Sequence, residues 1–152
     1  MNMKQIIFSL LLSFSLAAGL RAETGGVETV TIAAFNTMTY SVKKIEVRPG
    51  QKLVVVLMNK GTLPKNVMAH NWILLKGGVS ADAYAKAALK SNDFEPKGLA
   101  DEVIASVPAL GPDESGTAVF TAPTVPGSYA YLCTAVGHVM GGSGMRGVLI
   151  VK

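Results

Sequence analysis

Short segments in which apolar residues alternate with polar ones, or run together, occupy most of this chain from residue 27 onward. Segments of this length, rich in β-branched residues and bounded by glycine, proline and asparagine, predict β-strands. We expect strands at 27–32, 40–47, 52–59, 71–75, 102–107, 116–121, 128–132 and 147–151. The nearly all-apolar run at 52–59 predicts a strand covered on both faces. About eight short strands predict an all-β fold, a Greek-key β-sandwich or barrel.

The segment 76–106 interrupts this β pattern. Residues 80–90 are rich in alanine, Ser80 is suited to cap a helix, and Asp82 would interact favourably with the helix dipole. We expect a helix of about three turns, then an irregular flap over 92–98. Frayed coil is the alternative, because few of these residues are strongly apolar. The pattern gives this insertion no purpose.

The first 22 residues form a separate segment. Lys4 is followed by the apolar run 6–18, and Ala22 offers a small residue before Glu23, so the pattern predicts an export signal cleaved near Ala22/Glu23. The alternative is a transmembrane anchor, but the apolar run is shorter than the ~20 residues that a spanning helix needs. No cysteine near the cleavage site could carry a lipid. We therefore expect a periplasmic protein with no stable membrane anchor and one domain, 23–152.

Removal of the export signal would lower the net charge, and export would place the single cysteine in an oxidising environment. Without Lys4 and Arg21, the 14 basic residues fall to 12, against 10 acidic ones. This near balance argues against nucleic acid or a membrane surface as a partner. Cys133 is the only cysteine, so no disulfide can form within the chain, although an exported protein could hold one. A lone thiol in such a protein indicates a reactive or ligating role.

The residues around Cys133 suggest what that role is. His138 follows after four residues, Met140 and Met145 lie in the same glycine-rich stretch, and the other histidine is His70. One thiolate, two imidazoles and a thioether form the ligand set of a blue-copper electron-transfer site. Metal coordination would keep the thiol deprotonated. Taken singly, a buried cysteine or a histidine beside a tryptophan is more often ordinary packing.

Two segments of the chain resemble azurin, a cupredoxin. The first is Leu63-Pro-Lys-Asn-Val-Met-Ala-His-Asn-Trp-Ile-Leu74, which is similar to the first-ligand segment of azurin. The second comprises 131–138 and 145–151, which resemble its ligand loop and last strand. The similarity extends from about residue 27 to residue 152, and every cysteine and histidine of the chain lies within the two segments.

This resemblance implies a set of site residues. His70, Cys133 and His138 would form a trigonal plane around one copper ion. The backbone carbonyl of Ala69, where azurin commonly has glycine, would make a weak axial contact. Asn71 and Thr134 match positions that tie the two ligand segments together around the thiolate, and such outer contacts orient the ligands.

The axial thioether stays open between two residues. Azurin carries its methionine four positions after the second histidine, where this chain has Gly142. We favour Met145, because Met-Arg-Gly before a final strand resembles the Met-Lys-Gly of azurin. Met140 is the alternative, and Met145 could also be core packing. Ala135 and Val136 replace an aromatic residue and a proline, which predicts a more mobile loop.

The resemblance also implies a docking surface and partners. Leu63, Met68, Val139 and Met140 would form an apolar rim around His138. In azurin-like proteins such a rim contacts transient redox partners, here c-type cytochromes or copper or haem oxidoreductases. The bland alternative is that Met68 and Val139 pack inward. The resemblance implies a monomer.

We therefore expect a periplasmic copper electron carrier that turns over no substrate and is not an enzyme. A copper chaperone or store is the alternative, because the glycines after His138 would suit a more open ligand loop. A cysteine-nucleophile enzyme using Cys133 is a third hypothesis, but nothing in the sequence marks a substrate cleft. The G-x-G-x-x-G pattern at 142–147 precedes a strand, not a helix, and so does not indicate a dinucleotide site.

Overall fold

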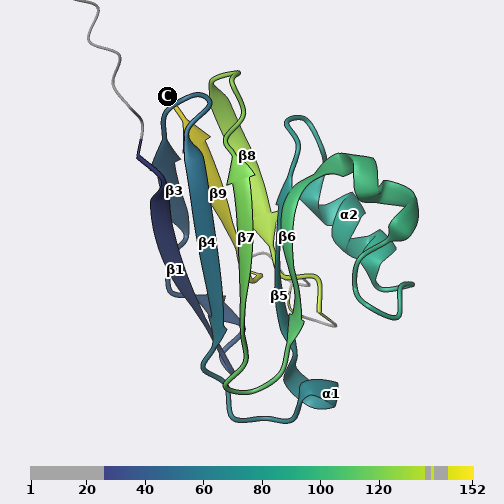
Figure 1. The fold of residues 1–152 in the computed structure, drawn as a ribbon. Coiled ribbons are helices and arrows are strands. Elements are labelled where there is room, and N and C mark those ends of the chain that lie inside the picture. The colour runs from purple at the N-terminus through teal and green to yellow at the C-terminus, as the bar shows by residue number, and fades with distance from the viewer. Residues whose placement is uncertain (1–25, 136–137, 139–143) are drawn as a thin grey trace, which may run out of the picture.

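The computed structural model describes residues 26–135, 138 and 144–152, which form two β-sheets packed face to face (Figure 1). The strand order is β2-β1-β4-β7 in one sheet and β3-β9-β8-β5-β6 in the other. The strands are β1 (Glu28–Phe35), β2 (Thr39–Tyr40), β3 (Lys44–Val47), β4 (Lys52–Asn59), β5 (His70–Leu75), β6 (Val103–Leu110), β7 (Ser115–Thr121), β8 (Gly127–Leu132) and β9 (Arg146–Val151). Pairing is parallel between β1 and β4 and between β3 and β9, and antiparallel elsewhere. The predicted β-sandwich is confirmed.

The prediction of one strand at 40–47 was wrong, and this adds a ninth strand to the described chain. Tyr40 belongs to β2 in the four-stranded sheet, whereas β3 lies in the five-stranded sheet. The reason is Ser41, whose backbone N–H and side-chain oxygen both bond to the backbone of Ala33 on β1. These bonds hold the chain to β1, so it leaves that sheet before β3 can pair with β9.

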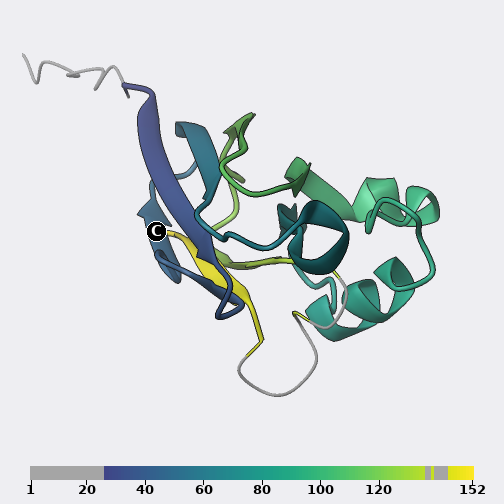
Figure 2. The same cartoon turned by 90° about the horizontal axis from the view of Figure 1, so that it is seen from below.

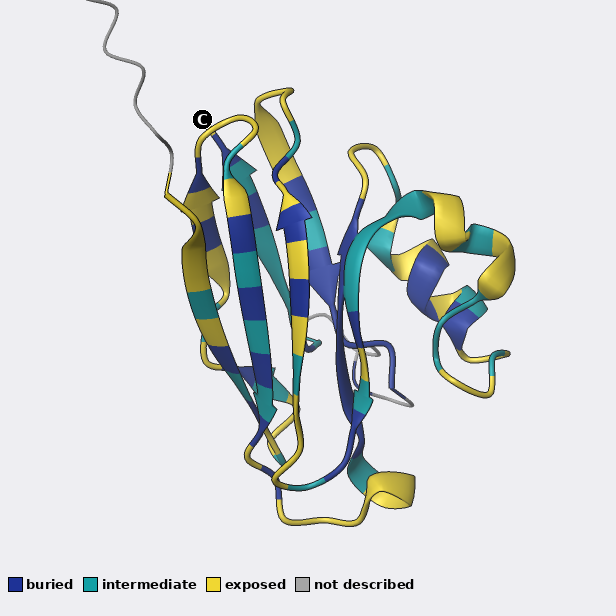
Figure 3. Cartoon of the chain, viewed as in Figure 1, coloured by how far each residue is buried: buried dark blue, intermediate teal, exposed yellow. Residues whose placement is uncertain are grey.

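The core lies between the sheets and is built from alternating positions of the strands. Along β4, every second residue is buried and the residues between are half-buried or exposed (Figure 3). The expectation that both faces of this strand are covered was therefore wrong. Its buried face packs into one cluster with the inward residues of the other sheet. The largest fully buried members of that cluster are Trp72, Tyr131, Ile32, Leu53, Leu57, Leu74, Met145 and Leu149.

Tyr131 and Gly147 face one another across β8 and β9. The ring of Tyr131 occupies the space where a side chain at residue 147 would stand. Its hydroxyl reaches past this point and donates a hydrogen bond of 2.8 Å to the carbonyl of Val42. The missing side chain of Gly147 therefore makes room for the ring beside the start of the last strand.

The expected insertion lies between β5 and β6 and covers the outer face of the five-stranded sheet (Figure 2). It contains α2 (Ala81–Ala88) and the 3-10 helix η1 (Lys97–Glu102). Ser80 caps α2 by accepting the N–H of Ala83 at 3.3 Å, as predicted. The helix has eight residues, about two turns rather than three. Because β6 begins at Val103, the insertion spans 76–102, and we call these residues the flap.

The segment expected to be a loop at 60–66 ends in a short helix, α1 (Lys65–Met68). In the part of the chain that the structure describes, no helix is long and apolar enough to cross a membrane. The predicted export signal at 1–22 lies outside the described residues.

Candidate metal centre

His70, Cys133 and His138 come together at one end of the sandwich. His70 is the first residue of β5, Cys133 follows the last residue of β8, and His138 lies in the connection to β9. Their ligand atoms all lie within 4.8 Å of one another, and all three residues are buried. Within the described residues, no other group of three or more histidine, cysteine or acidic side chains is arranged to hold a metal. The three residues are positioned to bind one metal ion.

The two imidazoles are neutral and available as ligands. Burial, and then the neighbouring His138, lowers the pKa of His70 from 6.5 to about 4. Burial also lowers the pKa of His138. Both ring nitrogens of His70 are buried, and neither has a partner at hydrogen-bond geometry among the described residues, although the Phe35 backbone is near enough to oppose the lowering of its pKa. Buried polar atoms are rarely left unpaired, and a coordinated metal would supply the missing partner.

The sulfur of Cys133 lies against polar groups in an otherwise apolar site. It is 3.3 Å from Nδ1 of His138 and 3.5 Å from the backbone nitrogen of Asn71, whose N–H donates to it. Without a cation, burial raises the pKa of the thiol to about 11, although the N–H groups of Asn71 and Ala135 act in the opposite direction. Copper prefers soft thiolate and imidazole ligands, so the donor set fits that metal.

These pKa shifts predict that copper binding at pH 7 releases one proton. In the metal-free protein the thiol is protonated and both imidazoles are neutral, so only Cys133 has a proton to lose. The apparent copper affinity should therefore rise about tenfold per pH unit between pH 7 and 8. Calorimetry in buffers of different ionisation enthalpy measures the released proton. Cys133→Ser should release none, and release of two protons would show that an imidazole starts out charged.

Met145 is buried, and its backbone lies beside two of the three ligands. Its N–H donates to the carbonyl of His138 at 2.7 Å, and its carbonyl accepts the N–H of Cys133 at 2.9 Å. These two bonds place its backbone next to both ligands of the segment. Ala69, which precedes His70, is also buried. Met140 lies outside the described residues.

Asn71 and Thr134 connect the two ligand segments by two hydrogen bonds. The Asn71 amide nitrogen donates to Thr134 Oγ1 at 2.7 Å, and the Thr134 N–H donates to Asn71 Oδ1 at 2.8 Å. The sequence analysis missed two further partners: the Tyr40 hydroxyl, which donates to the Asn71 carbonyl, and the Phe94 carbonyl, which accepts from Thr134 Oγ1 at 2.6 Å. Both come from segments remote in sequence, and no motif marks them.

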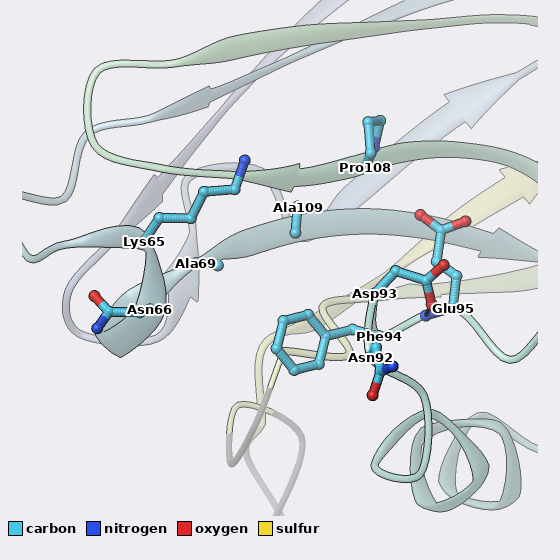
Figure 4. A pocket seen from close by; sticks show the side chains of 9 residues that line it. All are labelled: Lys65, Asn66, Ala69, Asn92, Asp93, Phe94, Glu95, Pro108 and Ala109. Carbon is cyan, nitrogen blue, oxygen red and sulfur yellow. Dashed lines mark hydrogen bonds between the residues drawn. The ribbon is translucent and has the colours of Figure 1, made fainter.

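A cleft of about 820 Å³ opens between α1, the flap and β6 (Figure 4). It is lined by Lys65, Asn66, Ala69, Asn92, Asp93, Phe94, Glu95, Pro108 and Ala109. A smaller cavity of about 50 Å³ shares Lys65, Asn66, Ala69 and Phe94 with it and also reaches Val67, Ala135 and His138. Cys133 is not among the residues that line either space. The sequence contained no sign of this cleft.

The apolar rim expected around His138 is described in part. Leu63 is exposed and Met68 is half-buried. Val67, which the sequence analysis did not name, is 62% exposed and lines the small cavity with His138. Val139 and Met140 lie outside the described residues.

A sandwich of two β-sheets with a buried His-Cys-His cluster at one end is the arrangement found in cupredoxins. The sequence profile of the family described as copper binding proteins, plastocyanin/azurin family, matches residues 27–152. The chain belongs to this family. It is 32% identical to the azurin of Pseudomonas fluorescens biotype A over 134 residues, which cover 81% of this chain and 97% of that protein.

Solved structures of auracyanins superpose on this chain. Auracyanin A, a "blue" copper protein from Chloroflexus aurantiacus, superposes with a TM-score of 0.72 at 30% identity and covers 84% of this chain and all of that one. Reduced auracyanin from Roseiflexus castenholzii superposes with a TM-score of 0.67 at 35% identity, covering 82% and 96%. The chain is thus an azurin-like cupredoxin with copper as its cofactor, in a family of electron-transfer proteins.

Proposed function

We propose that this protein is a periplasmic blue-copper electron carrier that exchanges single electrons between redox proteins and turns over no substrate. The observation that carries the proposal is the closed, buried cluster of His70, Cys133 and His138. An enzyme would need an open coordination position or an accessible nucleophile. A redox shuttle needs neither, because no substrate has to reach the metal.

Some residues of the site would bind the metal, and others hold those ligands in place. His70, Cys133 and His138 would hold the copper, and the Met145 thioether and the Ala69 carbonyl would be its weaker ligands. Copper supplies the one-electron change between Cu(II) and Cu(I). Burial excludes water, and the Asn71–Thr134 bonds hold the two ligand segments at one distance. A scaffold that keeps the same geometry in both states reduces the reorganisation on electron transfer.

Electrons would pass through the edge of His138. The proposal is supported by the exposed apolar side chain of Val67, which lines a small cavity with His138, and by the exposed Leu63 and half-buried Met68 in the same segment of the chain. We place Val139 and Met140 in the same docking patch. The partners would be c-type cytochromes or copper or haem oxidoreductases that bind transiently to a monomer, since a small apolar patch suits weak encounters. The periplasmic location rests on residues 1–22, read as a cleaved export signal.

Titration of the mature protein with Cu(II), followed by visible absorption and EPR, tests this function. We expect an intense blue thiolate-to-copper band that saturates at one equivalent, with narrow copper hyperfine splitting. Reversible redox cycling without loss of metal should accompany it. Pale, weakly bound copper with an ordinary tetragonal EPR spectrum would contradict the electron-carrier function and favour a copper chaperone or store.

The axial ligand is tested by Met145→Leu. Loss of the thioether removes an electron donor from the metal and adds an apolar group, so the more highly charged Cu(II) state is destabilised and the reduction potential rises. A tenfold change in relative affinity for the two oxidation states corresponds to about 59 mV for one electron, and we expect a shift of this order. Met140→Leu is the matched control. A shift in Met140→Leu alone would transfer the role to that residue.

A further inference from the structure

We propose that the flap is the outer support of the copper site, with the Phe94 carbonyl as the group that positions the Cys133 sulfur through Thr134 and Asn71. The effect on copper rests on the function proposed above, whereas the effect on the metal-free protein does not. Neither the ligand pattern nor the family match assigns the flap a role.

The first observation is a continuous chain of hydrogen bonds from the flap to the sulfur. Thr134 Oγ1 has one hydrogen, which it donates to the Phe94 carbonyl at 2.6 Å. The same oxygen accepts the Asn71 side-chain amide at 2.7 Å. The backbone N–H of Asn71 in turn points at the Cys133 sulfur at 3.5 Å. Because Asn71 and Thr134 are fully buried, water cannot readily replace a lost partner.

The second observation is the backbone of Phe94, which has a φ of +61°. This left-handed conformation is unfavourable for a bulky residue and persists only where its surroundings enforce it. Here the N–H of Phe94 donates to the Ser91 carbonyl at 3.3 Å, and its ring packs against the main core cluster. In Figure 4 the ring extends into the cleft, towards the side on which Asn66 lies. The conformation aims the Phe94 carbonyl at Thr134.

The third observation is that the flap packs against the outer face of β5 and β8, the two strands that lead to the ligands. Tyr84 and Ala85 of α2 pack with Ile73 and Leu75 of β5 and with Leu132 of β8. These strands lead to the two ligand segments: β5 begins at His70, and β8 ends one residue before Cys133. The flap therefore supports β5 and β8 by packing, and through the Phe94 carbonyl it also supports Thr134 and its partner Asn71.

A further contact joins the flap to the far end of the ligand segment. Asp82 of α2 pairs with Arg146, the residue after Met145, at 2.8 Å. The Asp82 side chain is 81% exposed, so this ion pair contributes little by itself. The part-buried bond from Thr134 to Phe94 is the stronger link, because its loss leaves the buried Thr134 hydroxyl without that acceptor.

The test compares Phe94→Pro with Phe94→Gly in the metal-free protein. Both variants lose the ring, but glycine permits a positive φ, whereas proline fixes φ near −65° and moves the carbonyl. The readout is the rate at which a thiol reagent modifies Cys133. We expect Phe94→Pro to react about fivefold faster than Phe94→Gly, the change expected for one lost hydrogen bond. Denaturant unfolding of the same proteins separates local opening from global unfolding.

Thr134→Val makes the test specific for the proposed bond. In this background the hydroxyl is absent, so the difference between the proline and glycine variants should fall below twofold. An undiminished difference would show that proline acts through some other contact and would overturn the proposal. Equal rates for the two variants in the presence of Thr134 would overturn it as well.

A second pair of variants applies if Phe94→Pro does not fold. Thr134→Val removes the hydroxyl that donates to the Phe94 carbonyl, and the control Thr134→Ser keeps it. We expect the thiol reagent to modify Cys133 about fivefold faster in Thr134→Val than in Thr134→Ser, the change expected for one lost hydrogen bond, and equal rates would overturn the proposal. With copper bound, the proline variant should shift the potential. A shift in thiol reactivity without any blue copper band would leave the support role intact and refute the electron-carrier function.

Discussion

Replacing Cys133 by serine is expected to abolish the intense blue absorption and to weaken copper binding more than about 100-fold. Loss of a residue that only orients a metal ligand typically lowers affinity by 10- to 100-fold, and Cys133 supplies the sulfur itself. A serine hydroxyl keeps its proton at neutral pH and is a poor ligand for copper. His70 and His138 remain, so weak Cu(II) binding with an ordinary spectrum should persist. Absorption and calorimetry measure both effects.

The control for this experiment is Thr134→Ser, which keeps a hydroxyl at the neighbouring position. Its hydrogen bonds to Asn71 and Phe94 can still form, so the blue band should persist in this variant. Circular dichroism should show that both variants retain the β-sandwich. An intense band in Cys133→Ser would mean that the thiolate is not the ligand responsible for the colour.

The second large effect is expected from Gly147→Ala. A methyl group at this position would overlap the ring of Tyr131, its partner across β8 and β9. The ring cannot move without losing its hydrogen bond to the Val42 carbonyl. Overpacking of this kind costs about 3 kcal/mol. Chemical denaturation of the metal-free protein measures the loss.

Gly98→Ala is the matched control. Gly98 lies in η1, and a methyl group there would meet nothing within 4 Å. Its free energy of unfolding should stay within about 0.5 kcal/mol of the unmodified protein. If Gly147→Ala were equally stable, the space beside Tyr131 would have to open by a movement of β9.

Hydrophobic patterning predicted the sandwich well because alternation and strand length depend on local sequence. It failed at 40–47, where apolar and polar residues alternate and only the pair Lys43-Lys44 interrupts the alternation. The change of sheet there is decided by the bonds of Ser41 to β1, a contact between strands that the local pattern does not contain. The length of α2 was overestimated because the expected range included Ser80, which is the cap, and Leu89 and Lys90, which are exposed turn residues after the helix.

The site was predictable to the extent that it consists of rare residues. The chain holds one cysteine and two histidines, so their joint placement in two recognisable segments was informative, and the structure brings them together. The supporting contacts were not predictable. The Tyr40 hydroxyl and the Phe94 carbonyl act on Asn71 and Thr134 from distant segments, and any residue can contribute a backbone carbonyl. The cleft beside α1 likewise depends on how the flap packs.

The wide sequence separation of the ligands bears on folding. His70 and Cys133 stand 63 positions apart, and the chain has no second cysteine for a disulfide. Copper held by both residues would close that loop as a cross-link does. In the chain-entropy description, closing a loop of this size removes about 4 kcal/mol of freedom from the unfolded state. The cofactor would then also cross-link the sandwich, and the free energy of unfolding should be larger for the copper-loaded protein than for the metal-free one.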